Sequence, residues 1–132
     1  MPASIRIAAV ALIRGGDILL VRKRGSRRFM LPGGKYAPGE SARDCAVREV
    51  EEEIGVRLAP ADLDELGEFS APAANEPGRQ VSGRIFVTAF AGEARARAEI
   101  EDVVWRPVGG DGPDLAPLLR LAVLPALRLR GG

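Results

Sequence analysis

The fold of this protein is decided by residues 34–56, which read GKYAPGESARDCAVREVEEEIGV. Within this stretch, residues 42–54 contain neither proline nor glycine, and Ser41 precedes them as an N-cap with Asp44 three positions on, in a partial capping box. Gly55 follows the run, and a glycine in this position commonly ends a helix by adopting positive φ. We therefore predict a helix over residues 42–54.

Three glutamates share one face of that helix. At about 100° per residue counted from Glu49, Glu52 lies at about −60° and Glu53 at about +40°. Like charges at these spacings repel one another by roughly 0.2–0.5 kcal/mol a pair on an exposed helix, and a divalent cation would reverse that cost. On spacing alone, a solvated acidic surface is the simpler interpretation, because runs of charge usually face water.

The chain offers few metal ligands other than oxygen. It has no histidine and one cysteine, Cys45, which excludes an internal disulfide and disfavours a zinc site. Carboxylates and carbonyls suit a hard ion, with Mg²⁺ as the first choice and Mn²⁺ as a substitute. The lone thiol is expected to serve packing rather than chemistry.

Outward from this stretch, the preceding residues predict strands and a turn. Residues 5–13 and 18–21 are apolar and enclose a glycine turn, as in a β-hairpin. Farther on, Pro32 and the two glycines after it predict a tight loop.

The following residues predict further strands and one more helix. The strands are expected at residues 68–70, 81–90 and 103–105. The helix is expected after Asp114 as its N-cap, ending or bending near Pro125. Strands with two interspersed helices favour a mixed β-sheet between helices.

Composition narrows the class of protein. With 132 residues, 46% of them hydrophobic, and a net charge of +1, the chain is expected to form a single domain over residues 1–132 of ordinary soluble type. Nucleic acid is not expected as its partner. The apolar run of residues 5–13 contains Arg6 and is too short to span a membrane, so we expect no membrane association and a cytoplasmic location.

Residues 34–56 also resemble the signature of a known family. Gly34, five residues, Glu40, seven residues, and then REVEEEIGV from Arg48 match the Nudix box at every fixed position. The resemblance extends before the box, through a variant of an aromatic-x-Leu-Pro-Gly-Gly entry, and after it to the strand around Trp105. It implies a MutT-like Nudix hydrolase, with an α/β fold in which a mixed sheet lies in an α/β/α sandwich.

The resemblance assigns metal ligands. Glu49, Glu52 and Glu53 would bind Mg²⁺, helped by a backbone carbonyl of Gly33 or Gly34. The bound metal would neutralise the oxygens of a diphosphate and lower the pKa of a water that attacks phosphorus.

Other residues of the motif would support these ligands or contact substrate. Arg48 would hold a carboxylate in place, and Glu40 is expected to brace the loop against the helix. Arg22, Lys23 and Arg24 end the second strand, where the family often places a basic residue against substrate phosphate, and alternation lets Arg22 and Arg24 share a face. A solvated basic strand end explains these residues equally well.

The general base has to be a carboxylate in a chain without histidine. Glu52 and Glu53 are the first choice, and Glu99, Glu101 or Asp102 is the distal alternative that the family also shows. The sequence leaves this choice open.

The implied substrate is a nucleoside diphosphate linked to another group, and the leading candidate is a nucleoside triphosphate. A Ser-Gln-Pro motif after the box, typical of NADH diphosphatases, is missing, and the only tyrosine lies inside the box, unlike in diadenosine polyphosphate hydrolases. We therefore predict a nucleoside triphosphate pyrophosphohydrolase of the kind that sanitises nucleotide pools. Phe69, Asn75 and Phe86 are conceivable contacts to the base.

Three alternatives remain at this point. Pro72 lies near a proline of ADP-ribose hydrolases of the family, which allows an ADP-ribose or other nucleotide-sugar diphosphatase. A module that binds nucleotides without catalysis is disfavoured by the intact Arg-Glu-x-x-Glu-Glu. An isopentenyl-diphosphate isomerase would need a cysteine outside the box and usually a histidine, and both are missing. Monomer and homodimer are equally compatible with the sequence.

Overall fold

The computed structural model describes residues 4–130, so residues 1–3 and 131–132 of the expected domain lie outside the described part. It begins with the predicted hairpin, in which β1 (Ile5–Arg14) and β2 (Asp17–Lys23) are antiparallel. The remaining elements, in chain order, are β3 (Phe29–Met30), β4 (Gly33–Lys35), α1 (Ala42–Ile54), the 3-10 turn η1 (Pro60–Asp62), β5 (Asp64–Pro72), β6 (Gln80–Ala89), β7 (Ile100–Pro107), the π-helical turn η2 (Leu119–Val123) and α2 (Leu124–Leu129).

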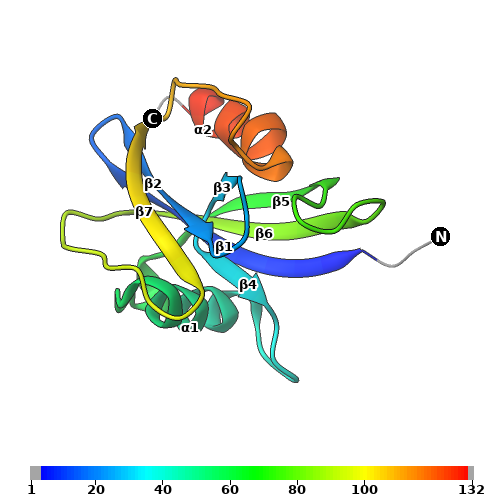
Figure 1. Ribbon diagram of the computed structural model, residues 1–132. Helices are drawn as coiled ribbons and strands as arrows, with labels where there is room; N and C mark the ends of the chain where they lie inside the picture. Colours follow the sequence, from blue (N-terminus) through cyan, green and yellow to red (C-terminus); the bar gives the residue numbers. More distant parts are fainter. Residues whose placement is uncertain (1–3, 131–132) are drawn as a thin grey trace.

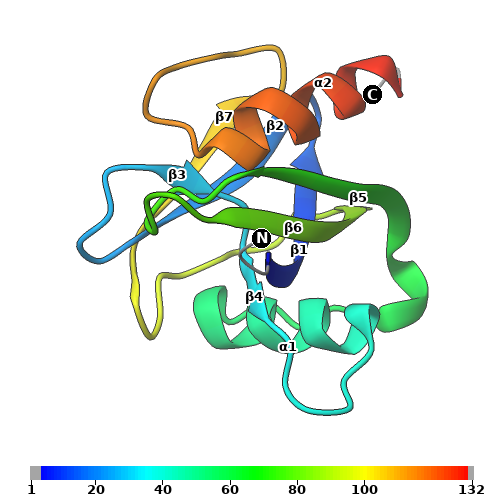
Figure 2. The same ribbon diagram turned by 90° about the vertical axis from the view of Figure 1, so that its right-hand side faces the viewer.

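One mixed sheet forms the middle layer of the molecule. Its strand order is β3-β2-β1-β6-β5, and in addition β4 pairs with β1 and β7 pairs with β2. The pair of β1 and β6 is parallel, and the other pairs are antiparallel. Helix α1 covers one face of the sheet and α2 lies on the other (Figures 1 and 2). The predicted mixed sheet between helices is therefore confirmed.

Helix α1 has the bounds that the sequence predicts. The Ser41 side chain accepts a hydrogen bond of 3.1 Å from the Asp44 backbone N–H. Gly55 ends the helix with a φ of 70° and donates its N–H to the carbonyl of Glu51. Both end signals act within one turn of the chain, so they do not depend on the rest of the fold.

The loop predicted from Pro32 onward is wrong for three residues. Gly33–Lys35 form strand β4, with Gly33 opposite Ala9 and Gly34 opposite Ala8 of β1. A Cβ on Gly33 would lie 2.4 Å from the carbonyl oxygen of Ala8. Glycine here permits a close approach of two backbones rather than ending regular structure.

The last helix also differs from the prediction. Asp114 does not cap it, because its carboxylate pairs with Arg106 and helical structure begins at Pro117. The helical segment continues past Pro125 to the end of α2, with the wide turn η2 just before the proline, which has no N–H to donate. No helix within residues 4–130 is long and apolar enough to span a membrane.

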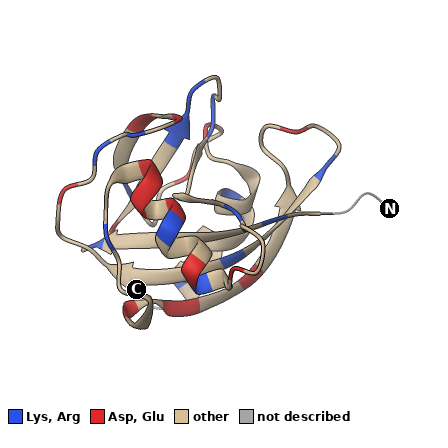
Figure 3. Cartoon of the chain, turned by 90° about the horizontal axis from the view of Figure 1, so that it is seen from below, with Lys and Arg blue, Asp and Glu red and all other residues tan. Residues whose placement is uncertain are grey.

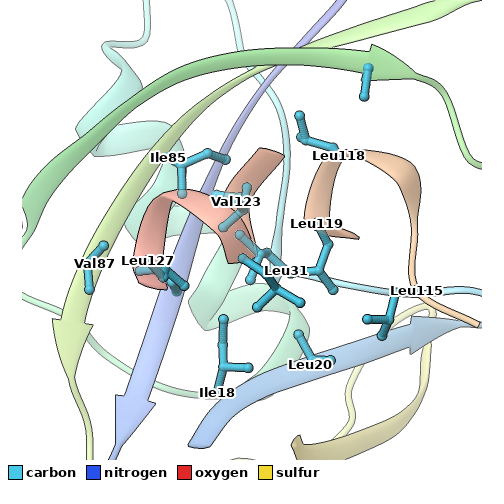
Figure 4. Close-up of a cluster of buried hydrophobic side chains, with 14 residues drawn as sticks. Ile18, Leu20, Leu31, Ile85, Val87, Leu115, Leu118, Leu119, Val123 and Leu127 are labelled. Carbon is cyan, nitrogen blue, oxygen red and sulfur yellow. The ribbon is translucent and has the colours of Figure 1, made fainter. Parts of the chain in front are cut away.

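Two apolar clusters fill the two sides of the sheet. Leu19 and Val21 of β2 belong to the cluster on the α1 side. Ile18 and Leu20 belong to the cluster that packs against the C-terminal helical segment (Figure 4). Successive residues of β2 thus alternate between the face of α1 and the face of α2, which decides where the charged end of this strand points.

Candidate active site

A cavity of about 410 Å³ connects the acidic side of α1 with the C-terminal helical segment. Strands β1 and β2 pair only beside their turn, and β4 pairs with the other part of β1 and carries Gly33 and Gly34 to the cavity wall. The charged side chains that line the cavity are Lys23, Lys35, Glu49, Glu53, Glu76 and Glu99. The volume lies in the range of small-molecule sites.

Glu53 is the buried carboxylate of this cavity. Only 7% of the residue is exposed, and its Oε1 accepts a 3.0 Å hydrogen bond from the Gly33 backbone N–H. Burial raises the pKa of Glu53 to about 7, because the charged form loses hydration, and the Gly33 hydrogen bond offsets part of this rise. No cationic side chain among the described residues forms an ion pair with it, so Glu53 is poised to accept a positively charged ligand.

Glu49 lines the same cavity one helical turn earlier. Its side chain packs so closely on Gly34 that a Cβ there would lie 2.4 Å from Glu49 Oε1. Its other oxygen accepts a 2.9 Å hydrogen bond from Arg48. Gly34 therefore makes the space that the Glu49 carboxylate occupies.

Arg48 connects the helix to the loop before it. Its guanidinium forms a bidentate pair with Glu40, at 2.7 and 2.8 Å, and also donates to the Lys35 carbonyl. Hydrogen bonds from Arg48, and then from the Ala37 N–H, lower the pKa of Glu40 to about 2. The bracing role predicted for Glu40 agrees with these contacts, and in Figure 3 the acidic and basic residues of α1 lie side by side.

Glu52 occupies a different position from the other two predicted ligands. Its side chain is 55% exposed, pairs with Arg48 at 3.2 Å and is not among the cavity-lining residues. Ligation by Glu52 would require its side chain to leave Arg48 and turn toward the cavity.

The three distal acids are separated by the structure. Glu99 lines the cavity, and its backbone carbonyl accepts a 2.8 Å hydrogen bond from the Arg24 N–H. Ala98 before it has a φ of 52°, a left-handed conformation that turns the chain into β7. Glu101 and Asp102 instead pair with Arg22.

Lys23, rather than its arginine neighbours, lines the cavity. Arg22 is held by Glu101 at 2.6 Å and by Asp102, and neither Arg22 nor Arg24 is part of the cavity wall. The alternation of β2 explains this, because Lys23 shares the α1 face with Val21. The alternation of residues along β2 can be read from the sequence, but only the fold shows which face of the strand meets the cavity.

One of the three residues predicted to contact the nucleotide base lines the cavity. Asn75 lines it, whereas Phe86 is buried in the α1 cluster and Phe69 packs against the cluster on the opposite side. Ser26, which the sequence did not single out, donates a hydrogen bond to Asn75.

Cys45 is expected to resist thiol reagents in the folded protein. It is fully buried, donates to the Gly34 carbonyl at 3.4 Å, and burial raises its pKa to about 11, so little thiolate forms. Titration with a disulfide reagent at mildly alkaline pH should label no thiol in native protein and one thiol per chain in denaturant. Rapid labelling of the native protein would contradict this.

The donors at the cavity fit a hard divalent cation. Glu49 and Glu53 contribute carboxylates, and Gly33 and Gly34 bring backbone to the same wall. As these side chains stand, no three carboxylate or thiol groups in residues 4–130 converge to enclose an ion. Glu49 contacts Arg48 and Glu53 contacts Gly33, so both would turn on binding.

Comparison with known proteins agrees with this fold. The NUDIX domain model matches residues 4–110. A protein of Mycobacterium tuberculosis named "Putative 8-oxo-dGTP diphosphatase 2" is 32% identical over 121 residues, covering 76% of this chain and 79% of that protein. The CTP pyrophosphohydrolase of Escherichia coli is 32% identical over 111 residues, covering 76% and 74%.

Solved structures give the same result. The crystal structure of a MutT NUDIX hydrolase from Burkholderia pseudomallei superposes with a TM-score of 0.80 at 25% identity, covering 96% of this chain and 99% of that one. The match of the domain model over residues 4–110 includes the whole box and the cavity-lining strands. The chain therefore belongs to the Nudix family, and it is a Nudix-type pyrophosphohydrolase.

Proposed function

We propose that the protein hydrolyses a nucleoside triphosphate to the monophosphate and pyrophosphate, with Mg²⁺ as cofactor and Mn²⁺ as a substitute. The observation that carries this proposal is the single cavity in which two α1 carboxylates and two lysines meet a large apolar wall. The lysines and a metal suit a polyphosphate, and the apolar wall suits a base. The names of the two relatives, a diphosphatase of an oxidised guanine nucleotide and a CTP pyrophosphohydrolase, point the same way.

Glu49 and Glu53, with a carbonyl of Gly33 or Gly34, would hold the cation in this proposal. Mg²⁺ commonly takes few protein carboxylates and keeps several waters. When bound, the cation supplies neutralisation of the phosphate oxygens and a water of lowered pKa. Arg48 positions Glu49 through its 2.9 Å hydrogen bond, and Glu52 remains a predicted ligand that would first have to leave Arg48.

Glu99 is the proton acceptor that we propose for the attacking water. Among the five carboxylates considered as bases, Glu52 pairs with Arg48, Glu53 is bonded to the Gly33 N–H, and Glu101 and Asp102 hold Arg22. Glu99 lines the cavity, and its carboxylate forms no hydrogen bond or ion pair with any group in residues 4–130. An unpaired carboxylate is free to take a proton as water adds to phosphorus and the anhydride bond between the α- and β-phosphates breaks.

Two lysines are placed to contact the phosphates. Lys23 lines the cavity near Glu53, and Lys35 lies on β4 beside the glycines. Lys35 is 4.0 Å from Glu76, with 69% of its side chain exposed, so this pair is weak and a phosphate can displace it. The arginines predicted for this task, Arg22 and Arg24, remain candidates only for a part of the substrate that extends outside the cavity.

Replacing Glu99 tests the proposed function with a matched neighbour as control. We expect Glu99→Gln to lower kcat for pyrophosphate release from nucleoside triphosphates by about 10²-fold, because it removes the proton acceptor. Glu101→Gln, two residues away and outside the cavity wall, should change kcat less than about threefold, because a solvated ion pair contributes little. The measurement is phosphate and pyrophosphate release over a nucleotide panel with Mg²⁺.

Two results would contradict the proposal in different ways. If Glu99→Gln and Glu101→Gln lowered kcat equally, Glu99 would not be the proton acceptor, and the proposed substrate class would still stand. Wild-type protein that hydrolyses another nucleoside diphosphate derivative but no triphosphate would overturn the substrate class.

A further inference from the structure

The cavity has one wall without any charge. Its α2 side is formed by aliphatic side chains of β1, β6 and the C-terminal helical segment, namely Ile5, Ile7, Val81, Ile85, Leu118 and Leu119. No aromatic side chain of residues 4–130 lines the cavity. A base in this space would therefore pack between aliphatic groups, which hold its flat faces but do not distinguish one base from another.

Asn75 is the one uncharged side chain in the described cavity lining that forms conventional hydrogen bonds. It lies in the hairpin between β5 and β6, whose turn is closed by hydrogen bonds from the Ala73 N–H to Arg79 O and from the Arg79 N–H to Glu76 O. Discrimination among bases of similar shape depends on such polar contacts to the base edge. Asn75 is the residue placed to make one.

Ser26 sets the direction in which the Asn75 amide points. Ser26 is 7% exposed, and its Oγ accepts from the Arg28 N–H at 3.1 Å. A hydroxyl has one proton to donate, and Asn75 Oδ1 at 3.0 Å is closer than the other acceptor, Arg28 O, at 3.4 Å. With Oδ1 occupied by Ser26, the Asn75 amide presents its Nδ2 donors, which bond to no group in residues 4–130.

We propose that Asn75 determines base specificity by donating from Nδ2 to a carbonyl oxygen on the base edge. This inference rests on the proposed function, since it requires a nucleotide in the cavity. A guanine presents a carbonyl where adenine presents an amino group, so guanine-type substrates are favoured over adenine-type ones. Ser26 is the positioning residue that keeps the donor facing the ligand.

The chain's two carboxamide side chains, Asn75 and Gln80, provide a matched experiment. Asn75→Asp replaces the donor with an acceptor of the same shape, and Gln80→Glu makes the same change on an exposed residue at the start of β6, outside the cavity wall. Calorimetry would measure binding of dGMP and dAMP to each protein with Mg²⁺. Steady-state assays would measure hydrolysis of dGTP and dATP.

Wild type and Gln80→Glu should bind dGMP about tenfold more tightly than dAMP, and Asn75→Asp should reverse this order. The ratio of the two affinities is the informative quantity, because the added charge weakens both nucleotides alike. Ser26→Ala should reduce the ratio without reversing it, since the amide then loses its fixed direction.

An unchanged ratio in Asn75→Asp would overturn the inference, including the case in which both affinities fall equally through a contact to sugar or phosphate. A ratio that changes as expected while no triphosphate is hydrolysed would sustain the inference and overturn the proposed reaction. The two failures are therefore distinguishable.

Discussion

Glu53→Gln is expected to lower kcat/KM about 10³-fold and, in metal-free buffer, to make the folded protein more stable. Glu53 is a cavity carboxylate at 7% exposure whose only hydrogen bond in the described structure comes from the Gly33 N–H. Glutamine keeps an oxygen for that N–H but loses the charge that a cation requires, so activity falls by the amount typical of a lost electrostatic contact in an active site.

The stability gain follows from the raised pKa of Glu53. Burial raises this pKa from 4.5 to about 7, so the folded state favours the protonated form. The stabilisation from that proton is fully present below the unfolded pKa of 4.5 and is lost as the pH rises through about 7. Above this range the wild type contains a buried, unpaired charge, and Glu53→Gln should be more stable by about 1–3 kcal/mol.

Denaturant unfolding at several pH values in the presence of a chelator would measure this difference. Glu51→Gln is the control, because Glu51 lies on the same helix but pairs with Arg57 outside the cavity wall. Glu51→Gln should retain wild-type kcat/KM and the wild-type dependence of stability on pH. A Glu53→Gln variant that is less stable than wild type above neutral pH would show that the buried charge has a partner in solution.

The opposite effects on stability and activity have one physical origin. A carboxylate that is buried without a cation destabilises the folded chain, and a bound cation converts the same arrangement into an attractive one. Glu49 differs from Glu53, because Arg48 pairs with its carboxylate at 2.9 Å and the missing side chain of Gly34 keeps its space open. In the proposed site, the unpaired burial of Glu53 thus weakens the metal-free fold and favours binding of a cation.

Local signals explain which parts of the fold could be predicted from the sequence. Ser41 and Gly55 fix the two ends of α1 through contacts within a few residues, and the helical phase of Glu49, Glu52 and Glu53 follows from those ends. The first hairpin is local in the same sense. Strand β4 forms by pairing with β1, which lies more than twenty residues earlier in the chain. Without that pairing, its two glycines predict a loop.

The site was less predictable, because it depends on which face of each helix or strand meets the cavity and not only on where the helices and strands lie in the sequence. Glu52 shares a helix face with Glu49 and Glu53 by phase, yet in the structure the cavity lies on the Glu53 side and Arg48 holds Glu52 away. Lys23 lines the cavity and its neighbour Arg22 does not, because α1 packs on the face of β2 that contains Val21. Such choices are made by tertiary packing, which spacing alone does not encode.

Two adjacent glycines should respond differently to alanine. At Gly34 the new Cβ would lie 2.4 Å from Glu49 Oε1, a side-chain atom that can turn away. We expect Gly34→Ala to fold with nearly wild-type stability and to lower kcat/KM about 10²-fold, because the new methyl group takes the space at the cavity wall that the Glu49 carboxylate needs to reach a cation. Kinetics and thermal unfolding of the same preparation would measure both quantities.

Gly33→Ala should instead destabilise the fold, by about 3 kcal/mol. Its Cβ would lie 2.4 Å from the Ala8 carbonyl oxygen, a backbone atom that can move only if β4 separates from β1. Gly16→Ala is the control, because no atom lies within 4 Å of its Cβ position, and it should change neither stability nor activity. If Gly34→Ala were as unstable as Gly33→Ala, the Glu49 side chain would be fixed more rigidly than a metal ligand that must turn on binding, and the ligand role proposed for Glu49 would fail.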